Sequence, residues 1–370
     1  MQIDSARLVD NFLCLVQIDS APRAEAEMAA EIIRQLQGLG VAAHMDNAGA
    51  LVGGNAGNVI AKIPGKSGKP TIMFSAHMDR VEPGLKIKPV VRDGVIYSDG
   101  STILAADDVA GIAAIIEAIH VLQETQAEHG PLEVVFTIVE EGGLHGAKNL
   151  DYSQLNADFG YALDSSGPVG SAIIQGPAQD KIEAVIYGKA AHAGVNPEDG
   201  INAIVAASRG IAEMKTGRID HETTANIGTI KGGTATNIVT DKVEILAEAR
   251  SLQNDKLERQ SQHMRECLER AAAAMGARAE VKVARMYSAF RLDAGAPVLA
   301  LFKRACRKVN LSGELIPSGG GSDANIFNAN GIPTANIGIG YKKVHTTEEN
   351  MAVKDLEAVA RLTLELITNA

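Results

Sequence analysis

The 370-residue sequence contains no tryptophan, and aromatic residues make up only 4% of it. It therefore lacks the aromatic platforms on which many proteins stack bases or sugars. Positive charge is also scarce, because 35 lysines and arginines stand against 45 aspartates and glutamates and leave a formal net charge of −10. We therefore expect neither nucleic acid nor an anionic membrane to be its partner.

Long apolar runs are missing as well. No stretch reaches the roughly 18 residues that would suggest a membrane span, and the acidic N-terminus has no basic region followed by an apolar core, as a signal peptide would. Only three cysteines occur, Cys14, Cys267 and Cys306. Their odd number and wide spacing favour reduced thiols that pack in the core over a disulfide framework. These absences lead us to expect a cytoplasmic protein.

The sequence does contain a regular alternation of short apolar strands and helices. Apolar strands are predicted at 58–63, 71–77 and 132–139 and in YALD at 161–164, and helices at 24–39 and 108–122. Continuous apolar strands that alternate with helices are typical of a mostly parallel sheet covered on both faces. The same pattern returns near the C-terminus with a helix at 295–309, a Gly/Ser-rich loop, the strand TANIGIG and a helix at 353–368.

The middle of the chain has a different pattern. Between about 178 and 291 the order is strand, helix, strand, strand, helix, strand, and the strands alternate apolar and polar residues. This order is that of the ferredoxin-like arrangement, and the alternation indicates a sheet with one solvated face. We predict an α/β protein with a doubly wound mixed sheet formed by residues 1–177 and 291–370. A ferredoxin-like α+β domain, residues 178–290, is inserted into it.

The segment FTIVEEGG raises the main functional question, because Glu140 and Glu141 follow an apolar strand directly. Adjacent carboxylates at the edge of a core repel each other and lose hydration. Other metal-ligand types also follow predicted strands or begin a helix, and in α/β sheets ligands gather at the carboxyl ends of the strands. They are His77, Asp79, Asp107, Asp108, Asp164 and His345.

Two imidazoles and several carboxylates suit two divalent ions with mixed nitrogen and oxygen ligands. Zinc is favoured, and cobalt or manganese are possible substitutes. One glutamate of the pair would then bind a metal while the other, unligated, acts as a general base. Each residue alone also has a structural interpretation, since Asp107 and Asp108 are common N-cap residues and a Glu-Glu pair often lies in a solvated turn. The residues by themselves leave open which of the two aspartates would bridge.

Seven segments occur in the order found in the M20 metallopeptidases: SAHMD, ADDVAG, TIVEEGG, YALDSSG, GKAAHAG, SGGGSDANIF and VHTTEE. Essentially the whole chain resembles the peptidase T (tripeptidase) branch of that family and its peptidase T-like relatives. Val109 stands where many relatives have lysine, a departure that touches no ligand. The resemblance implies a two-zinc site in the larger domain and a lid or dimerisation domain in the insertion.

The resemblance also assigns roles at the two-zinc site. His77 and Asp164 would bind one zinc, Glu141 and His345 the other, and Asp107 would bridge them. Glu140 would be the general base. Asp79 would accept the second N–H of the His77 imidazole. The peptide bond between Asp107 and Asp108 is expected to be cis.

The inserted domain carries a second set of residues that the resemblance implies. His192 in GKAAHAG would reach a neighbouring active site and stabilise the oxyanion, which makes a homodimer through this domain the expected assembly. Asn237 and Arg250 would hold the substrate, although Arg250 could instead pair with acids on the lid sheet. Gly320, in the loop 318–321, would offer its backbone N–H to the substrate.

These expectations describe a zinc exopeptidase that hydrolyses short peptides and releases the N-terminal residue of tripeptides. A carboxypeptidase or an N-acyl amino acid deacylase would use the same site, and the sequence does not separate them. A non-catalytic binding relative would have no need of Glu140. A nucleotide-binding oxidoreductase is disfavoured, because no glycine fingerprint follows the first strand.

Overall fold

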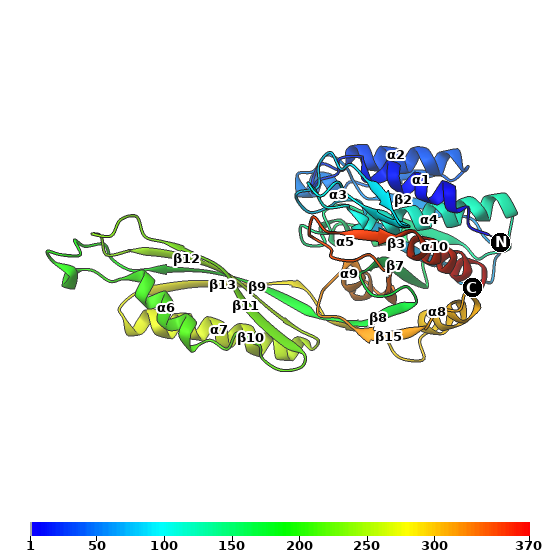
Figure 1. Ribbon diagram of the computed structural model, residues 1–370. Helices are drawn as coiled ribbons and strands as arrows, with labels where there is room; N and C mark the ends of the chain where they lie inside the picture. The colour runs from blue at the N-terminus through cyan, green and yellow to red at the C-terminus, as the bar shows by residue number, and fades with distance from the viewer. Residues whose placement is uncertain (1) are drawn as a thin grey trace. The chain divides into compact units, whose positions relative to one another are not determined.

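The computed structural model of the protein describes residues 2–370. The chain forms two compact units (Figure 1). The first consists of the chain up to Ile174 together with Arg291–Pro317 and Ser322–Ala370, and the second of Gln175–Phe290 with the short loop Ser318–Gly321. The predicted insertion is 178–290, whereas the second unit begins slightly earlier, at Gln175, and also contains the loop Ser318–Gly321.

A mixed sheet forms the centre of the first unit. Its strands follow the order β1 (Ala43–Met45), β2 (Val59–Ile63), β6 (Leu132–Thr137), β3 (Ile72–His77), β7 (Phe159–Ser165), β16 (Thr334–Gly338), β8 (Ser171–Gly176) and β14 (Phe290–Arg291), with β15 (Glu314–Pro317) paired to β8. The central strands β6, β3, β7 and β16 run parallel, and antiparallel strands flank them. Every residue of β6 and β3 is buried, so both faces of the sheet are covered.

Helices cover this sheet. They are α1 (Ser5–Val16), α2 (Ala26–Gly38), α3 (Ala48–Val52), α4 (Ala106–Thr125), α5 (His145–Lys148), α8 (Pro297–Lys308), α9 (Asp323–Ala329) and α10 (Val353–Thr368). The helix α4 is apolar almost all round, and it packs against β3 and β7 between α1 and α10. A helix of that composition is stable only when buried. A small sheet of β17 (Asn350–Ala352), β5 (Val95–Tyr97) and β4 (Val90–Arg92) completes the unit.

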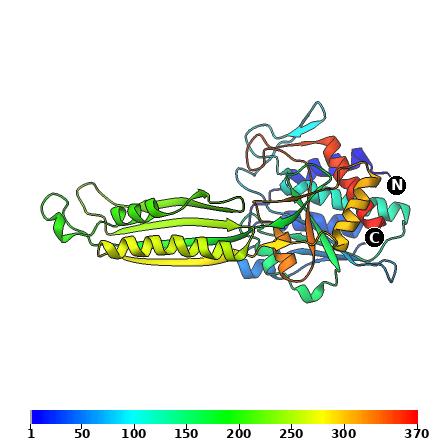
Figure 2. The ribbon, with the colours of Figure 1, turned by 90° about the horizontal axis from the view of Figure 1, so that it is seen from below.

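The second unit is an antiparallel sheet with two helices on one face. The strands follow the order β10 (Gly217–Arg218), β11 (Thr223–Gly232), β12 (Lys242–Ser251), β9 (Ala178–Tyr187) and β13 (Arg278–Tyr287). The helices α6 (Ala203–Glu213) and α7 (Asn254–Ala274) lie side by side along the sheet (Figures 1 and 2). Without the short β10, this is the strand order of the ferredoxin-like arrangement.

The predicted fold class is confirmed: a mixed α/β sheet with an inserted α+β unit. The cysteine prediction is partly wrong, because Cys267 and Cys306 are buried in the core but Cys14 is exposed on α1. Among the helices of residues 2–370, none combines the length and the apolar character that crossing a membrane requires.

Candidate metal centre

The predicted metal-ligand side chains of the first unit converge at the carboxyl ends of its parallel strands. His77 is the last residue of β3, and Asp164 lies one residue before the end of β7. Glu140 and Glu141 occupy the turn that follows β6, and Asp107 lies in the first turn of α4. Strands that run parallel end at the same edge of the sheet, which brings residues distant in sequence into contact.

The first group of donor atoms surrounds the His77 imidazole. Its Nε2 lies 3.0 Å from Asp107 Oδ1 and 3.8 Å from Asp164 Oδ1. His77 is buried, and its backbone N–H donates to Asp108 Oδ2 at 3.1 Å. Donor atoms of His77, Asp107 and Asp164 lie within 4.8 Å of one another, which is close enough to share one ion.

The second group surrounds His345, on the loop that follows β16. Its Nε2 lies 2.8 Å from Glu141 Oε1 and 3.4 Å from Asp107 Oδ2. Asp107 thus belongs to both groups, with Oδ1 toward one histidine and Oδ2 toward the other. A carboxylate in this position can bridge two ions, which typically lie about 3.5–4 Å apart.

The two adjacent aspartates have different surroundings. The Asp108 side chain is buried, its Oδ2 accepts the His77 backbone N–H, and among the described residues its Oδ1 has no hydrogen-bond partner. The peptide bond between Asp107 and Asp108 is cis, as the resemblance implied. The geometry therefore favours Asp107 over Asp108 as the bridging residue.

The turn that carries the two glutamates is held by buried carboxylates. Asp79 accepts the Glu140 N–H on Oδ1 at 2.8 Å and the Glu141 N–H on Oδ2 at 3.1 Å. Glu25 accepts the N–H of Val139 at 3.1 Å. We had expected the Asp79 carboxylate to accept from the His77 ring. The acceptor 2.9 Å from Nδ1 is instead the Asp79 backbone carbonyl, and the carboxylate lies 3.6 Å away.

Burial and the charges of the site raise the pKa values of three of its members. Burial and the nearby Asp164 charge raise the pKa of Glu140 well above its usual range. Burial and the Asp107 charge do the same for Asp164. Hydrogen bonds to Asp107 and Glu141 raise the pKa of His345 to about 10. Buried carboxylates this close together favour the binding of protons or cations, which reduce their mutual repulsion.

The donor set therefore fits a pair of divalent cations. Five side chains converge on two points that share Asp107, and each point has one imidazole nitrogen and carboxylate oxygens. Zinc, cobalt and manganese accept such mixed ligands. Two cations would also offset the repulsion and the lost hydration that the buried carboxylates otherwise suffer.

Three further residues, none of them among the predicted site residues, contact the site. The Tyr341 hydroxyl lies 3.3 Å from Asp107 Oδ1 and 3.4 Å from Asp164 Oδ1. The Asn336 amide pairs with the backbone N–H and carbonyl of Asp164. Glu349 accepts from the backbone before and within α4. The signal for Tyr341 was its place just beyond a strand, since the same rule had identified the ligands.

Asp323 is a buried carboxylate near this centre. Its Oδ2 accepts the Thr137 hydroxyl at 2.6 Å, and its Oδ1 has no partner. The N-cap of α9 is Ser322, which forms a capping box with Asn325, so Asp323 is not the capping residue of this helix. Burial raises the pKa of Asp323 to about 6.

This shift predicts a stabilising substitution in the metal-free protein. A folded-state pKa above the unfolded value means that stability is full below about pH 4 and falls as the pH rises through 6. Asp323→Asn should therefore raise the free energy of unfolding by about 3 kcal/mol at pH 8 and leave it unchanged at pH 4. Denaturant unfolding at both pH values measures this, with the exposed Asp10→Asn as control. Equal effects at the two pH values would contradict the expectation.

The second unit brings two of its predicted residues together. His192 is exposed and forms a β-bridge with Ile238, and the Ala193 N–H donates to the Asn237 carbonyl at 2.9 Å. The Gly194 N–H donates to His192 Nδ1 at 3.2 Å. Nδ1 is therefore an acceptor, which leaves Nε2 as the nitrogen that carries the proton in the neutral ring.

The other two predicted residues of this unit already have partners within it. Arg250 donates from Nε and Nη2 to the two oxygens of Glu248, at 3.0 and 3.1 Å, as in the alternative that paired it with an acid of the sheet. Its Nη1 takes no part in that pair. The Gly320 N–H donates to the Ser318 hydroxyl at 3.0 Å, within the same loop.

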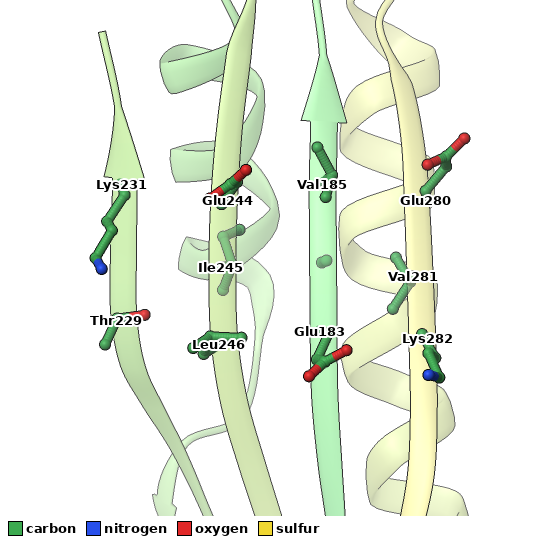
Figure 3. Close-up of a pocket in the computed structure, with 11 residues that line it drawn as sticks. Glu183, Val185, Thr229, Lys231, Glu244, Ile245, Leu246, Glu280, Val281 and Lys282 are labelled. Atoms are coloured by element: carbon green, nitrogen blue, oxygen red, sulfur yellow. The ribbon is translucent and has the colours of Figure 1, made fainter.

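A groove of about 430 Å³ lies on the sheet face of the second unit opposite its helices (Figure 3). Its charged side chains form ion pairs within the sheet, such as Lys242–Glu244 at 2.6 Å and Arg278–Glu280. No histidine or cysteine is among the residues that line it. The groove therefore offers no chemistry comparable to that of the first unit.

Comparison with known proteins places this site in a family. The model of peptidase family M20/M25/M40 matches residues 73–369. The chain belongs to this family. The match begins at β3 and includes every donor residue described above, so the M20 resemblance seen in the sequence motifs is confirmed.

Two solved structures are similar to this chain over nearly their whole length. Aminopeptidase PepT from Bacillus cereus is 48% identical over 99% of this chain and 98% of its own, with a TM-score of 0.92. A tripeptidase from Staphylococcus aureus is 42% identical over 100% of this chain and 99% of its own, with a TM-score of 0.96. The more distant Bacillus subtilis YxeP, described as a dinuclear metal-binding M20 peptidase, shares the fold at 21% identity, over 98% of this chain and 97% of its own (TM-score 0.74).

Proposed function

We propose that this M20 protein is a two-zinc exopeptidase that releases the N-terminal residue of tripeptides. The observation that carries the proposal is the position of Asp107, whose two oxygens face His77 and His345 within two groups of metal-ligand atoms. The similarity to an aminopeptidase and a tripeptidase over nearly the full chain supports the substrate class. Cobalt or manganese could replace zinc in this donor set.

His77 and Asp164 would hold one ion, Glu141 and His345 the other, and Asp107 both. The bound ions would supply Lewis-acid activation of the scissile carbonyl and of water. Asp79 keeps the Glu140–Glu141 turn in place through two backbone N–H groups. This arrangement gives the two adjacent glutamates different roles, because one faces His345 and the other does not.

Glu140 is the proposed general base. Its carboxylate lies within 4.8 Å of donor atoms of His77 and Glu141, yet it makes no ion pair with either histidine of the site. It would take a proton from the attacking water and return it to the leaving amine. His192 Nε2, from a partner subunit, would donate to the oxyanion, and Asn237, Arg250 and the Gly320 loop would hold the peptide.

Hydrolysis of one tripeptide tests the substrate class. The peptide is supplied with a free and with an acetylated N-terminus to zinc-loaded protein, each with and without a chelator. We expect release of the N-terminal residue from the free peptide only, and none with chelator. Cleavage of the acetylated peptide would instead support the carboxypeptidase or deacylase alternative, which uses the same site.

We further propose that the protein is cytoplasmic and forms a homodimer through its inserted unit. The strand β11 lies at the edge of its sheet, covered only by the two residues of β10. Apolar side chains of the inserted unit are exposed, among them Ile230 on β11 at 48% and Val195 at 75%. An open apolar edge strand favours pairing with a second chain.

A lysine on that edge should separate the dimer. Ile230→Lys places a charge on β11, and we expect sedimentation of the variant as a monomer while the unchanged protein sediments as a dimer. If His192 acts on the partner's site, the monomer should also lose about 10²–10³-fold in kcat. Leu85→Lys, an equally exposed position of the first unit, is the control. A dimeric Ile230→Lys would contradict the proposed interface.

A further inference from the structure

Glu349 is a buried carboxylate that contacts the metal centre only through the backbone. Its Oε2 accepts the N–H groups of Leu104 and Ala105, both at 2.9 Å, and its Oε1 accepts the Asp107 N–H at 3.0 Å. Only 1% of Glu349 is exposed. One side chain from near the C-terminus therefore accepts three N–H groups of a segment about 240 residues earlier in the chain.

These three N–H groups lie just before α4 and in its first turn, where a helix leaves its first donors without intrahelical acceptors. The residue at the N-cap position is Ala105, whose side chain cannot cap and whose φ is +60°. Asp107 also departs from helical geometry, with φ −83° and ψ 100°. Glu349 thus supplies the cap that the local sequence lacks. It does so where the backbone of the proposed bridging aspartate departs from helical geometry.

Glu349 belongs to the same tight loop as His345. Backbone hydrogen bonds in both directions between Lys342 and Asn350 close this loop, and the Glu349 N–H donates to the Thr346 carbonyl at 3.1 Å. His345 has a left-handed backbone, with φ +62°. Because Glu349 is part of the His345 loop and binds the Asp107 segment, it connects two of the side chains that face each other at 3.4 Å.

We propose that Glu349 is a positioning residue that sets the spacing between Asp107 and His345 and thereby the affinity of the centre for its metal ions. The inference rests on the proposed two-metal function. Glu349 itself is not a ligand, since both of its oxygens are occupied by backbone N–H groups. Residues that orient metal ligands typically contribute about 10–100-fold to metal affinity.

Glu349→Gln is the sharpest test because it changes one acceptor atom into a donor. The orientation that keeps the amide oxygen on Leu104 and Ala105 turns the NH₂ group toward the Asp107 N–H, so that two donors face each other. The disturbance then falls on the bridging aspartate. Glu348→Gln is the matched control, because Glu348 has the same charge but is exposed and pairs with Lys343.

The experiment titrates metal-free protein with Zn²⁺ against a chromophoric chelator and records thermal unfolding with and without Zn²⁺. We expect Glu349→Gln to bind Zn²⁺ about 10–100-fold more weakly and to gain less Tm from it, while Glu348→Gln matches the unchanged protein. A merely structural role would lower Tm equally with and without Zn²⁺. Unchanged Zn²⁺ affinity in a folded Glu349→Gln would overturn the proposal.

A second variant covers the case in which Glu349→Gln does not fold. Glu349→Asp keeps the charge, but its shorter side chain cannot reach all three N–H groups, so weaker Zn²⁺ binding is expected and unchanged affinity overturns the proposal. Failure of the function is recognised separately. If the unchanged protein binds two Zn²⁺ ions but cleaves no peptide, the function is wrong and the positioning role stands, whereas absent Zn²⁺ binding overturns both.

Discussion

Glu140→Gln is expected to lower kcat by about 10²–10⁴-fold while the protein keeps both metal ions. The glutamine occupies the same volume but cannot accept the proton of the attacking water. The Glu140 side chain makes no ion pair with a histidine of the site, so its loss should leave the donor set complete. Single-turnover rates and metal content of the same sample measure the two effects together.

Glu141→Gln is the matched control, since it makes the same chemical change one residue later. Glu141 Oε1 lies 2.8 Å from His345 Nε2, and loss of its charge should weaken the second metal position. Reduced metal content is therefore expected in this variant and not in Glu140→Gln. Metal loss in Glu140→Gln with full retention in Glu141→Gln would show that the two glutamates have the opposite roles.

Asp107→Asn is expected to abolish metal binding at both positions. Turnover should fall on the order of 10³-fold or more, because metal activation of water is lost with the ions. An amide has only one oxygen and cannot bridge two cations as a carboxylate does. Asp107 has one oxygen toward each histidine, at 3.0 and 3.4 Å, so both groups of donors depend on it. Metal analysis after exhaustive dialysis gives the stoichiometry.

Asp108→Asn makes the same change at the next residue and should be mild. Asp108 Oδ2 accepts the His77 N–H, and an amide oxygen can do the same. Burial already raises the pKa of Asp108 well above its usual range, so a neutral side chain suits its surroundings. A loss of metal in Asp108→Asn that equals or exceeds the loss in Asp107→Asn would assign the bridge to Asp108.

The position of the candidate ligands could be predicted from the sequence because each lies at a recognisable place in a regular pattern. His77 and Asp164 end apolar strands, and Glu140 follows another. The carboxyl ends of parallel strands lie at the same edge of the sheet. A polar residue at the end of an apolar run is therefore expected at that edge. The strands of the insertion alternate apolar and polar residues, which predicted a separate sheet with one solvated face.

The residues that support these ligands could not be predicted in this way. Glu25 and Glu349 contact the site by hydrogen bonds to segments far away in sequence. No periodicity marks such partners, because a hydrogen bond depends on where two segments meet and not on the local pattern of either. The acceptor for His77 Nδ1 shows the same limit, since Asp79 was identified but not its backbone carbonyl.

The sequence by itself determined the order of the elements, the inserted α+β unit and the family. Apolar periodicity and the order of motifs are properties of the chain itself, so they can be recognised without knowing which segments meet in space. The tertiary structure decided which of two adjacent aspartates faces both histidines and which carboxylates hold the backbone instead of facing the ligands. Those choices depend on which way each side chain points, because a hydrogen bond forms only when its two atoms lie about 3 Å apart. Only the packing of distant segments determines that direction.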